Sequence, residues 1–199
     1  MGGGGRDRAQ LRRRLRRLGL SGLAEAADQR LVRGERRRAE LIEATLAVIE
    51  RDGVGGVSHR SVARVAGVSP SAAIHHFATL DDLLVAAVTR ANEESVRAVE
   101  AVRDVRGLAE LLTREVVEER ARFVALFELY LLAARRPALR PEAYRWIESV
   151  RAAALRLGAD EVGARALTAA LDGLGIHALL TDEPPDRRRT AEVLRRTLP

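Results

Sequence analysis

The stretch SHRSVARVAGVSPSAAIHHF, residues 58–77, constrains the fold more than any other part of the sequence. Ser58 and Ser69 are typical helix N-cap residues, because a serine hydroxyl accepts an unpaired backbone N–H of the helix that follows. Pro70 suits the first position of a helix, where its missing N–H costs nothing. Gly67 suits the left-handed conformation that ends a helix. The stretch therefore predicts two short helices joined by a tight glycine turn, which is a helix-turn-helix.

Amphipathic helices are predicted on both sides of this stretch. The helix before it runs from Glu35 to Asp52, carries a broad apolar stripe and ends at Gly53. The helix after it begins at Thr79, where a capping box with Asp82 is expected, and continues to about residue 102. From residue 107 onward the chain predicts further helices interrupted by prolines, and no β-alternation competes with them. The predicted fold class is all-α.

Residues 35 to about 88 resemble the amino-terminal domain of the TetR (tetracycline-repressor) family. The resemblance is carried, in order, by AELIEATLAVIERDG, S-x-R-S-V-A-x-x-A-G-V-S, HHF and T-L-D-D-L-L. Two later segments, LFELYLLAARRPALRP and LDGLGIHALL, look like carboxy-terminal domains of the same family. The resemblance implies a three-helix helix-turn-helix head followed by a helical ligand-binding and dimerisation bundle. It divides the chain into a basic extension (1–33, partly disordered or helical), a DNA-binding domain (34–80) and an effector-binding and dimerisation domain (81–199).

The function that the resemblance implies is ligand-responsive, DNA-binding transcriptional regulation. We expect a repressor that binds a palindromic operator in double-stranded DNA as a homodimer and is released by a small, largely apolar effector. The alternative is a module that keeps the TetR fold for ligand or protein binding but has weakened or lost DNA recognition. Ile74 and Leu80 motivate this alternative, since the family usually has tyrosine at the first position and often lysine at the second, as do the short side chains of the turn Ser69–Ala73. The family usually has leucine where Ala73 stands, so the head is packed with a smaller residue.

The residues expected to contact DNA lie in and around the helix-turn-helix. The amino-terminal turn of the second helix meets base edges in such motifs, and Ser69 and Ser71 can form hydrogen bonds there. Arg60 and Arg64 lie one helical turn apart and are expected at phosphates. The expected set is Arg36, Arg37, Ser58, His59, Arg60, Arg64, Ser69, Pro70, Ser71, Ala72, Ile74, His75, His76 and Thr79.

The basic charge of the chain is concentrated ahead of the motif. The net charge is +6, and residues 1–38 hold twelve arginines against four acidic residues. This placement favours a polyanionic partner. The extension has three interpretations: a disordered arm, a source of phosphate contacts, or a membrane-surface helix through Leu11–Leu23.

Aromatic residues in the second half suggest either a core or a cavity. Phe123, Phe127 and Tyr130 recur at helical spacing, with Tyr144 and Trp146 nearby in the sequence. Ordinary core packing accounts for them. The resemblance implies instead that they line an effector cavity, to which Glu128 or His177 would add a polar contact. The effector-binding set is Phe123, Phe127, Tyr130, Tyr144, Trp146 and His177.

A second apolar stripe is assigned to the dimer. Gly173 and Gly175 lie within the same segment, and such small residues allow two helices to approach each other closely. Together with the last helix it is predicted to form a two-fold dimer face, burial inside the protomer being the alternative. The stripe consists of Leu167, Leu171, Leu174 and Ala178.

Several function classes are disfavoured. The chain has no cysteine, which excludes disulfides and thiolate metal sites. His75 and His76 point about 100° apart on a helix and do not converge on a metal. No catalytic constellation stands out, so we expect no enzyme, no metal and no cofactor. No apolar run reaches the roughly 18–20 residues of a membrane span, and a cytoplasmic protein is expected.

Overall fold

The computed structural model describes residues 21–181 and 184–199. The extension before residue 21, with most of the stretch proposed for a membrane surface, lies outside the described residues. The chain divides into two compact units, Met1–Leu41 and Ile42–Pro199, and each is considered by itself.

The first described helix, α2 (Ser21–Asp52), begins well before the expected start at Glu35. Residues 21–33 are rich in alanine, leucine and arginine, which are strong helix formers. Gly34 lies between them and the expected start of the helix, and one interior glycine costs only about 1 kcal/mol relative to alanine. The helix therefore continues through it. In the first unit, Arg36 and Arg37 both pair with Glu40, at 3.0 and 2.8 Å.

The predicted helix-turn-helix is present in the second unit. After α2 the chain turns at Gly53, which has φ 72°, and forms a short 3-10 helix, η1 (Val54–Gly56). Helices α3 (His59–Val65) and α4 (Pro70–His76) follow. Gly67 lies between them at φ 66°, in the left-handed conformation that the sequence predicts. We refer to residues 42–79 as the head and to residues 80–199 as the body.

The caps of the head agree with the sequence. The Ser58 hydroxyl accepts the N–H of Ser61, and the Ser69 hydroxyl accepts the N–H of Ala72 at 3.2 Å. Thr79 and Asp82 form the expected capping box, in which each side chain accepts a backbone N–H of the other residue. Between the caps, the buried side chains of the short helices hold the head together: Val62, Ala63, Ala73 and Phe77.

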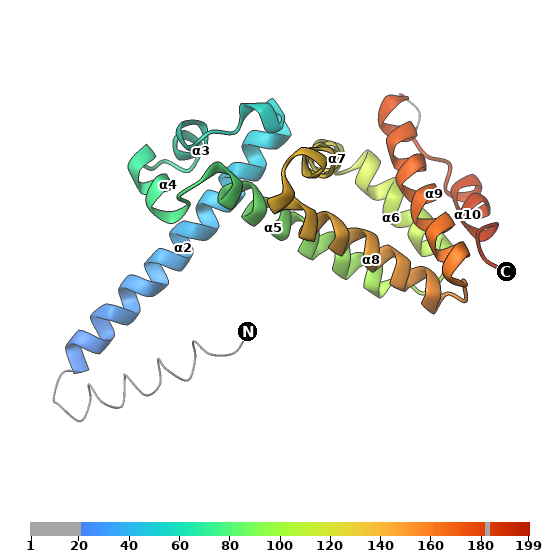
Figure 1. The fold of residues 1–199 in the computed structure, drawn as a ribbon, viewed down its shortest axis with the longest axis horizontal. Helices are drawn as coiled ribbons and strands as arrows, with labels where there is room; N and C mark the ends of the chain where they lie inside the picture. Colours follow the sequence, from blue (N-terminus) through green and yellow to red (C-terminus); the bar gives the residue numbers. More distant parts are fainter. Residues whose placement is uncertain (1–20, 182–183) are drawn as a thin grey trace. The chain divides into compact units, whose positions relative to one another are not determined.

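The body is built from helices throughout its described residues, which confirms the all-α fold class. None of the helices in the described part of the chain is long and apolar enough to span a bilayer. Figure 1 shows the helices in order: α5 (Leu80–Ala101), α6 (Val105–Val117), α7 (Arg120–Arg135), η2 (Pro137–Leu139), α8 (Arg140–Arg156), α9 (Glu161–Leu180) and α10 (Arg187–Arg195).

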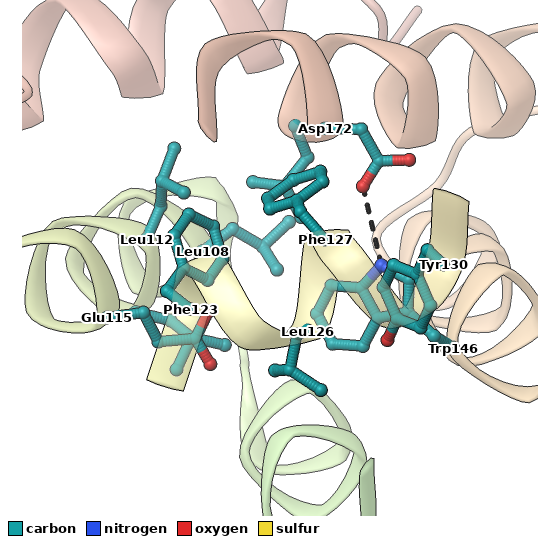
Figure 2. A pocket seen from close by; sticks show the side chains of 11 residues that line it. Leu108, Leu112, Glu115, Phe123, Leu126, Phe127, Tyr130, Trp146 and Asp172 are labelled. Carbon is teal, nitrogen blue, oxygen red and sulfur yellow. Dashed lines mark hydrogen bonds between the residues drawn. The ribbon is translucent and has the colours of Figure 1, made fainter. Parts of the chain in front are cut away.

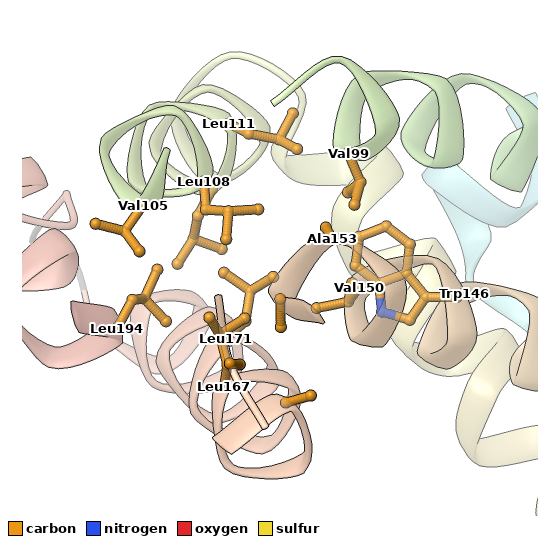
Figure 3. Packing of buried hydrophobic residues seen from close by; sticks show 14 of the residues in the cluster. Val99, Val105, Leu108, Leu111, Trp146, Val150, Ala153, Leu167, Leu171 and Leu194 are labelled. Carbon is orange, nitrogen blue, oxygen red and sulfur yellow. The ribbon is translucent and has the colours of Figure 1, made fainter. Parts of the chain in front are cut away.

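The core of the body joins six helices, α5 to α10. Helix α8 packs against α5 and α9, and α10 packs against α6. Figure 3 shows leucines of α9 and Leu194 of α10 meeting leucines of α6, with Val150 of α8 beside them. The apolar contacts therefore connect helices that are distant in the sequence.

This core corrects the assignment of the dimer stripe. Leu167 and Leu171 are buried inside the protomer, and Ala178 is buried with them. Leu174 is partly buried and packs against the same cluster. These side chains are spaced to face α6 and α8. The prediction of a dimer face is therefore wrong for this stripe, and the alternative, burial within one protomer, is correct.

Candidate DNA-binding face and effector pocket

Helix α4 presents one face to solvent. Pro70, Ser71 and His75 are exposed on it, and Ile74 is 51% exposed. Its opposite face buries Ala73 in the head. This inside-outside division follows from the 3.6-residue period, which brings residues 70, 71, 74 and 75 to one side. The side chains expected at DNA bases are therefore free to meet a partner.

Two guanidinium groups stand beside this face. Arg60 and Arg64 of α3 are both exposed and lie one turn apart. With Ser58, Ser61 and Pro70 they border an open surface hollow at the start of the two short helices. Arginine presents a planar fork of N–H donors that matches phosphate oxygens. The hollow thus combines cationic and hydroxyl groups suited to a nucleic-acid backbone.

The histidines of the head have different surroundings. His59 is half-buried, and its Nε2 lies 2.8 Å from the carbonyl oxygen of Phe77. Because a carbonyl oxygen only accepts, Nε2 donates, and the imidazole ties the start of α3 to the end of α4. This contact gives His59 a bracing role within the head, and its expected contact with a phosphate stays a prediction. His75 and His76 lie edge to face with ring centroids 5.5 Å apart.

Three hydroxyl groups among the residues expected to contact DNA cap the amino-terminal ends of helices. Ser58, Ser69 and Thr79 are exposed but act as N-caps, and the Ser69 and Ser71 hydroxyls lie 3.0 Å apart. A hydroxyl can donate and accept at once, so capping leaves capacity for a phosphate. Arg36 and Arg37 belong to the other compact unit and stay a prediction.

A pocket lies within the body, among α6, α7, α8 and α9. Its walls enclose about 440 Å³ of empty space, including part that is open to solvent. Four residues of the expected effector set line it, as Figure 2 shows: Phe123, Phe127, Tyr130 and Trp146. The other lining residues are Leu108, Leu111, Leu112, Glu115, Leu126, Leu171 and Asp172. The pocket is therefore aromatic and aliphatic with two carboxyl groups.

The two carboxyl groups lie in different parts of the pocket. In Figure 2, Glu115 lies beside Phe123, while Asp172 lies next to Trp146. Burial raises the pKa of Glu115 to about 7, and the negative charge of Glu119 adds to the rise. Burial also raises the pKa of Asp172, although the indole N–H of Trp146, 3.3 Å away, opposes the change.

A buried polar network supports the aromatic wall. The Tyr130 hydroxyl donates to the Asn92 side chain at 2.7 Å, and Asn92 donates to the backbone carbonyl of Glu142 at 2.8 Å. Burial raises the pKa of Tyr130, so its hydroxyl stays neutral. The network fixes the orientation of the ring across α5, α7 and α8.

Three expected polar or aromatic groups lie elsewhere. Tyr144 is 62% exposed and His177 is exposed, so neither is among the lining residues. Both lie on the solvent side of helices whose other sides face the core. Glu128, also considered for the pocket, instead accepts a hydrogen bond from the head.

Sequence reasoning missed Glu115 and Asp172. A signal for Glu115 exists, because it follows Leu108, Leu111 and Leu112 on the inward side of α6. A charge in that position breaks an otherwise apolar stripe, and buried ionisable groups are candidates for functional sites. The described residues contain no group of three metal-binding side chains.

A solvent-facing helix-turn-helix together with an aromatic pocket in a helical body defines a ligand-responsive DNA-binding regulator. Two sequence profiles match the chain: bacterial regulatory proteins of the tetR family over residues 41–87, and the tetracyclin repressor-like carboxy-terminal domain over residues 103–199. The chain belongs to the TetR family. Its class is that of non-enzymatic transcription regulators.

Solved structures agree over most of the chain. The multidrug binding protein EbrR complexed with ethidium is 44% identical, with a TM-score of 0.73, over 82% of this chain and 99% of EbrR. A TetR-family member from Streptomyces coelicolor A3, SCO1917, is 44% identical with a TM-score of 0.75, over 82% of this chain and 98% of that one.

A curated relative matches a shorter part. The nicotine-responsive transcriptional repressor HdnoR of Paenarthrobacter nicotinovorans is 34% identical over 51% of this chain. The chain covers 56% of the length of HdnoR, about half of it.

Proposed function

We propose that the chain is a repressor that binds a palindromic operator as a homodimer, in the cytoplasm, and releases it when an aromatic organic cation enters the pocket of the body. The observation that carries the proposal is the pairing of a solvent-facing α4 with a buried aromatic pocket that holds carboxyl groups. The first supplies a surface for the major groove. The second supplies a site whose occupancy can alter the protein.

The proposed effector class rests on the chemistry of the pocket walls. Aromatic rings attract cations through the negative charge of their faces, and a buried carboxylate gains most from a positive partner because water screens it little. Phe123, Phe127 and Trp146 offer rings, and Glu115 and Asp172 offer the charge. EbrR was crystallised with ethidium, proflavin and malachite green, and these dyes are aromatic cations. We therefore propose a charged aromatic effector in place of the small, largely apolar one expected from the sequence.

The proposed dimer uses the outer side of α9. Val162 and Leu180 are 75% and 80% exposed, and Ile176 is exposed between them. Together with small residues they form a continuous stripe opposite the buried one: Val162, Ala166, Ala169, Gly173, Ile176 and Leu180. An exposed apolar stripe of this length is a liability for a monomer, and small residues permit close helix contact. A second copy of α9 would cover it.

Two heads related by a two-fold axis would read half-sites separated by about 34–36 Å, one turn of DNA. Selection of sites from random DNA, followed by footprinting, tests this proposal. We expect a protected palindrome and its release by malachite green, an aromatic cation that does not intercalate in DNA. Binding without sequence preference would instead favour the module with weakened DNA recognition.

The dimer surface has its own test. Ala169→Glu places a charge in the middle of the exposed stripe and should give a monomer in analytical ultracentrifugation, with loss of operator binding. Ala101→Glu adds the same charge at an exposed site at the end of α5 and should leave the dimer intact. A dimeric Ala169→Glu protein would show that α9 does not form the interface.

A further inference from the structure

A carboxylate of the body caps the backbone of the head. The first N–H of η1, that of Val54, has no partner within its own helix, and Gly53 at the N-cap position offers no side chain. The Glu128 side chain of α7 fills this place, because its Oε2 accepts the Val54 N–H at 2.6 Å. A Cβ on Gly53 would lie 3.2 Å from Glu128 Oε1. The head backbone thus approaches the carboxylate closely.

The helix that carries Glu128 also forms one wall of the pocket. Phe123, Leu126, Phe127 and Tyr130 of α7 all line it (Figure 2). The ring centroids of Phe123 and Phe127 are 5.0 Å apart, edge to face. Phe127 is adjacent to Glu128 in the sequence, so one turn of α7 holds a ring at the pocket and a carboxylate at the head.

An effector has to move these rings. The pocket is almost filled by its own side chains, because the cavity left among them is only about 20 Å³, whereas ligand sites usually offer about 300–1,000 Å³. Its aromatic side chains already contact one another. A planar cation that inserts between them displaces their helix, because a packed helix moves as a unit. Any such displacement changes the distance from Glu128 to Val54, since a hydrogen bond tolerates only a few tenths of an ångström.

We propose that Glu128 is the positioning residue that transmits effector binding from the pocket to the head. In the empty protein its carboxylate holds η1, and with it the start of α3, in the geometry that binds DNA. In the effector-bound protein the bond to Val54 is lost and the head is released. The two states then differ in effector affinity, as any ligand-driven shift requires. This inference rests on the proposed function and names the contact through which effector binding reaches the head.

The other ties of α7 are of a different kind. Arg136 pairs with Asp81 at 2.5 Å and Arg122 pairs with Glu94 at 2.5 Å, both on α5 of the body. Both are partly exposed pairs between two side chains, and both stay within the body. The Glu128 bond is charge-assisted, partly buried and made to a backbone N–H, which fixes its direction. It also reaches the segment directly ahead of α3.

The test measures coupling instead of affinity alone. Its probe is malachite green, a propeller-shaped aromatic cation with which EbrR was crystallised and which, unlike ethidium, does not intercalate between base pairs. The operator dissociation constant is determined with and without saturating malachite green for the wild type and for Glu128→Ala, Glu128→Gln and Glu148→Ala. Glu148 is an exposed glutamate of α8 and serves as the charge-matched control. Reciprocity requires that bound operator weaken malachite green binding by the same factor, which provides an independent measurement on each variant.

We expect malachite green to weaken operator binding at least tenfold in the wild type and in Glu148→Ala. The factor should fall below threefold in Glu128→Ala, with malachite green affinity of the DNA-free protein within twofold of wild type. Glu128→Gln keeps an oxygen acceptor and should retain an intermediate factor. Glu128→Ala with the full wild-type factor would overturn the role of Glu128 and leave the proposed function standing. A wild type unaffected by malachite green would overturn both.

Hydrogen exchange in the wild type keeps the proposal testable if the alanine variant unfolds. The Val54 amide should be protected in the empty protein and should exchange at least tenfold faster with ethidium bound, because its acceptor has been withdrawn. Equal protection in both states would contradict the proposal.

Discussion

The head and the body place their functional groups in opposite environments. At the amino-terminal turn of α4 the groups expected at DNA bases are short side chains, of which Pro70 and Ser71 are exposed, and the exposed cations Arg60 and Arg64 lie beside them on α3. In the body, Glu115 and Asp172 are withdrawn from water among aromatic rings. The head is therefore suited to a large charged partner that remains solvated, and the pocket to a small one that loses its water.

This difference has an energetic consequence. An exposed arginine contributes mainly through counterion release, which depends on salt and hardly on pH. A buried carboxylate is sensitive to its protonation state, because burial penalises the ionised form. The two regions of one chain should accordingly respond to different variables, salt for the head and pH for the pocket.

The largest expected effect is on the head. Replacing both Arg60 and Arg64 with alanine should weaken operator binding by about 3–6 kcal/mol, at about 1.5–3 kcal/mol for each hydrogen bond to a charged group. The slope of log K against log salt should become less steep by about 2 units, one for each lost phosphate contact. Fluorescence anisotropy across a salt series measures both.

Arg106→Ala with Arg187→Ala is the matched control, because it removes the same charge from a surface groove of the body. It should leave the slope within half a unit of wild type. A slope that is unchanged in the Arg60 and Arg64 double variant would remove the phosphate role from the head.

The same contrast explains what the sequence could predict. The head is specified by local signals: Ser58, Ser69 and Thr79 at caps, and Gly67 at a positive φ. Each acts within a few residues of itself, so it can be read from the chain directly. The hydrogen bond of His59 could not be predicted from such local signals, because its partner, the Phe77 carbonyl, is eighteen residues away.

The pocket depends on contacts between distant segments. The spacing of the rings of α7 predicted a common face, and only the family resemblance implied that this face lines a cavity. Tyr144 has similar chemistry but lies outside the lining set, since only packing decides which side of α8 faces inward. The stripe from Leu167 to Ala178 was correctly seen as apolar. Two apolar stripes share α9, however, and periodicity alone does not tell which of them meets a second protomer.

A glycine tests how tightly the pocket wall is packed. A Cβ on Gly175 of α9 would lie 2.9 Å from Cζ of Phe123, so Gly175→Ala should destabilise the protein by about 1–3 kcal/mol through overpacking. It should also weaken ethidium binding. Thermal unfolding and dye titration measure the two effects.

Gly34→Ala is the contrasting substitution, since its Cβ would meet no atom within 4 Å. In a helix interior it should stabilise by up to about 1 kcal/mol. The same sign of change for both glycines would show that α9 and α7 can separate without cost, contrary to a tightly packed wall.

The pocket should respond to pH where the head does not. The folded, empty protein holds a proton on Glu115 below pH of about 7, and a cation favours the ionised carboxylate. Ethidium affinity should therefore rise by about tenfold from pH 6 to pH 8, as the ionised fraction of Glu115 grows. Isothermal titration in two buffers of different ionisation enthalpy should also show proton release.

Glu115→Gln removes the titrating group and should flatten this profile, with weaker binding at pH 8. The raised pKa also predicts how the stability of the protein depends on pH. Because the pKa of Glu115 in the folded state lies above its ordinary value, the folded protein holds this proton more tightly than the unfolded chain does. The empty protein therefore loses stability as pH rises through about 7. A pH-independent wild type would mean that Glu115 does not meet the cation.

The smallest effect separates two kinds of histidine within the head. His59→Ala removes the donor to the Phe77 carbonyl and should lower the free energy of unfolding by about 0.5–1.5 kcal/mol. Operator binding should weaken with it, because α4 is less firmly held. The salt slope should stay at its wild-type value, since a brace releases no counterion. Chemical unfolding and the salt series provide both numbers.

His75→Ala should give the reverse pattern. His75 is exposed on the outer face of α4, so its loss should leave the free energy of unfolding unchanged while it alters operator binding directly. If His59→Ala instead flattened the salt slope by about 1 unit with no change in stability, His59 would belong to the DNA surface. Helix α3 would then contribute a histidine, as well as its two arginines, to the phosphate contacts.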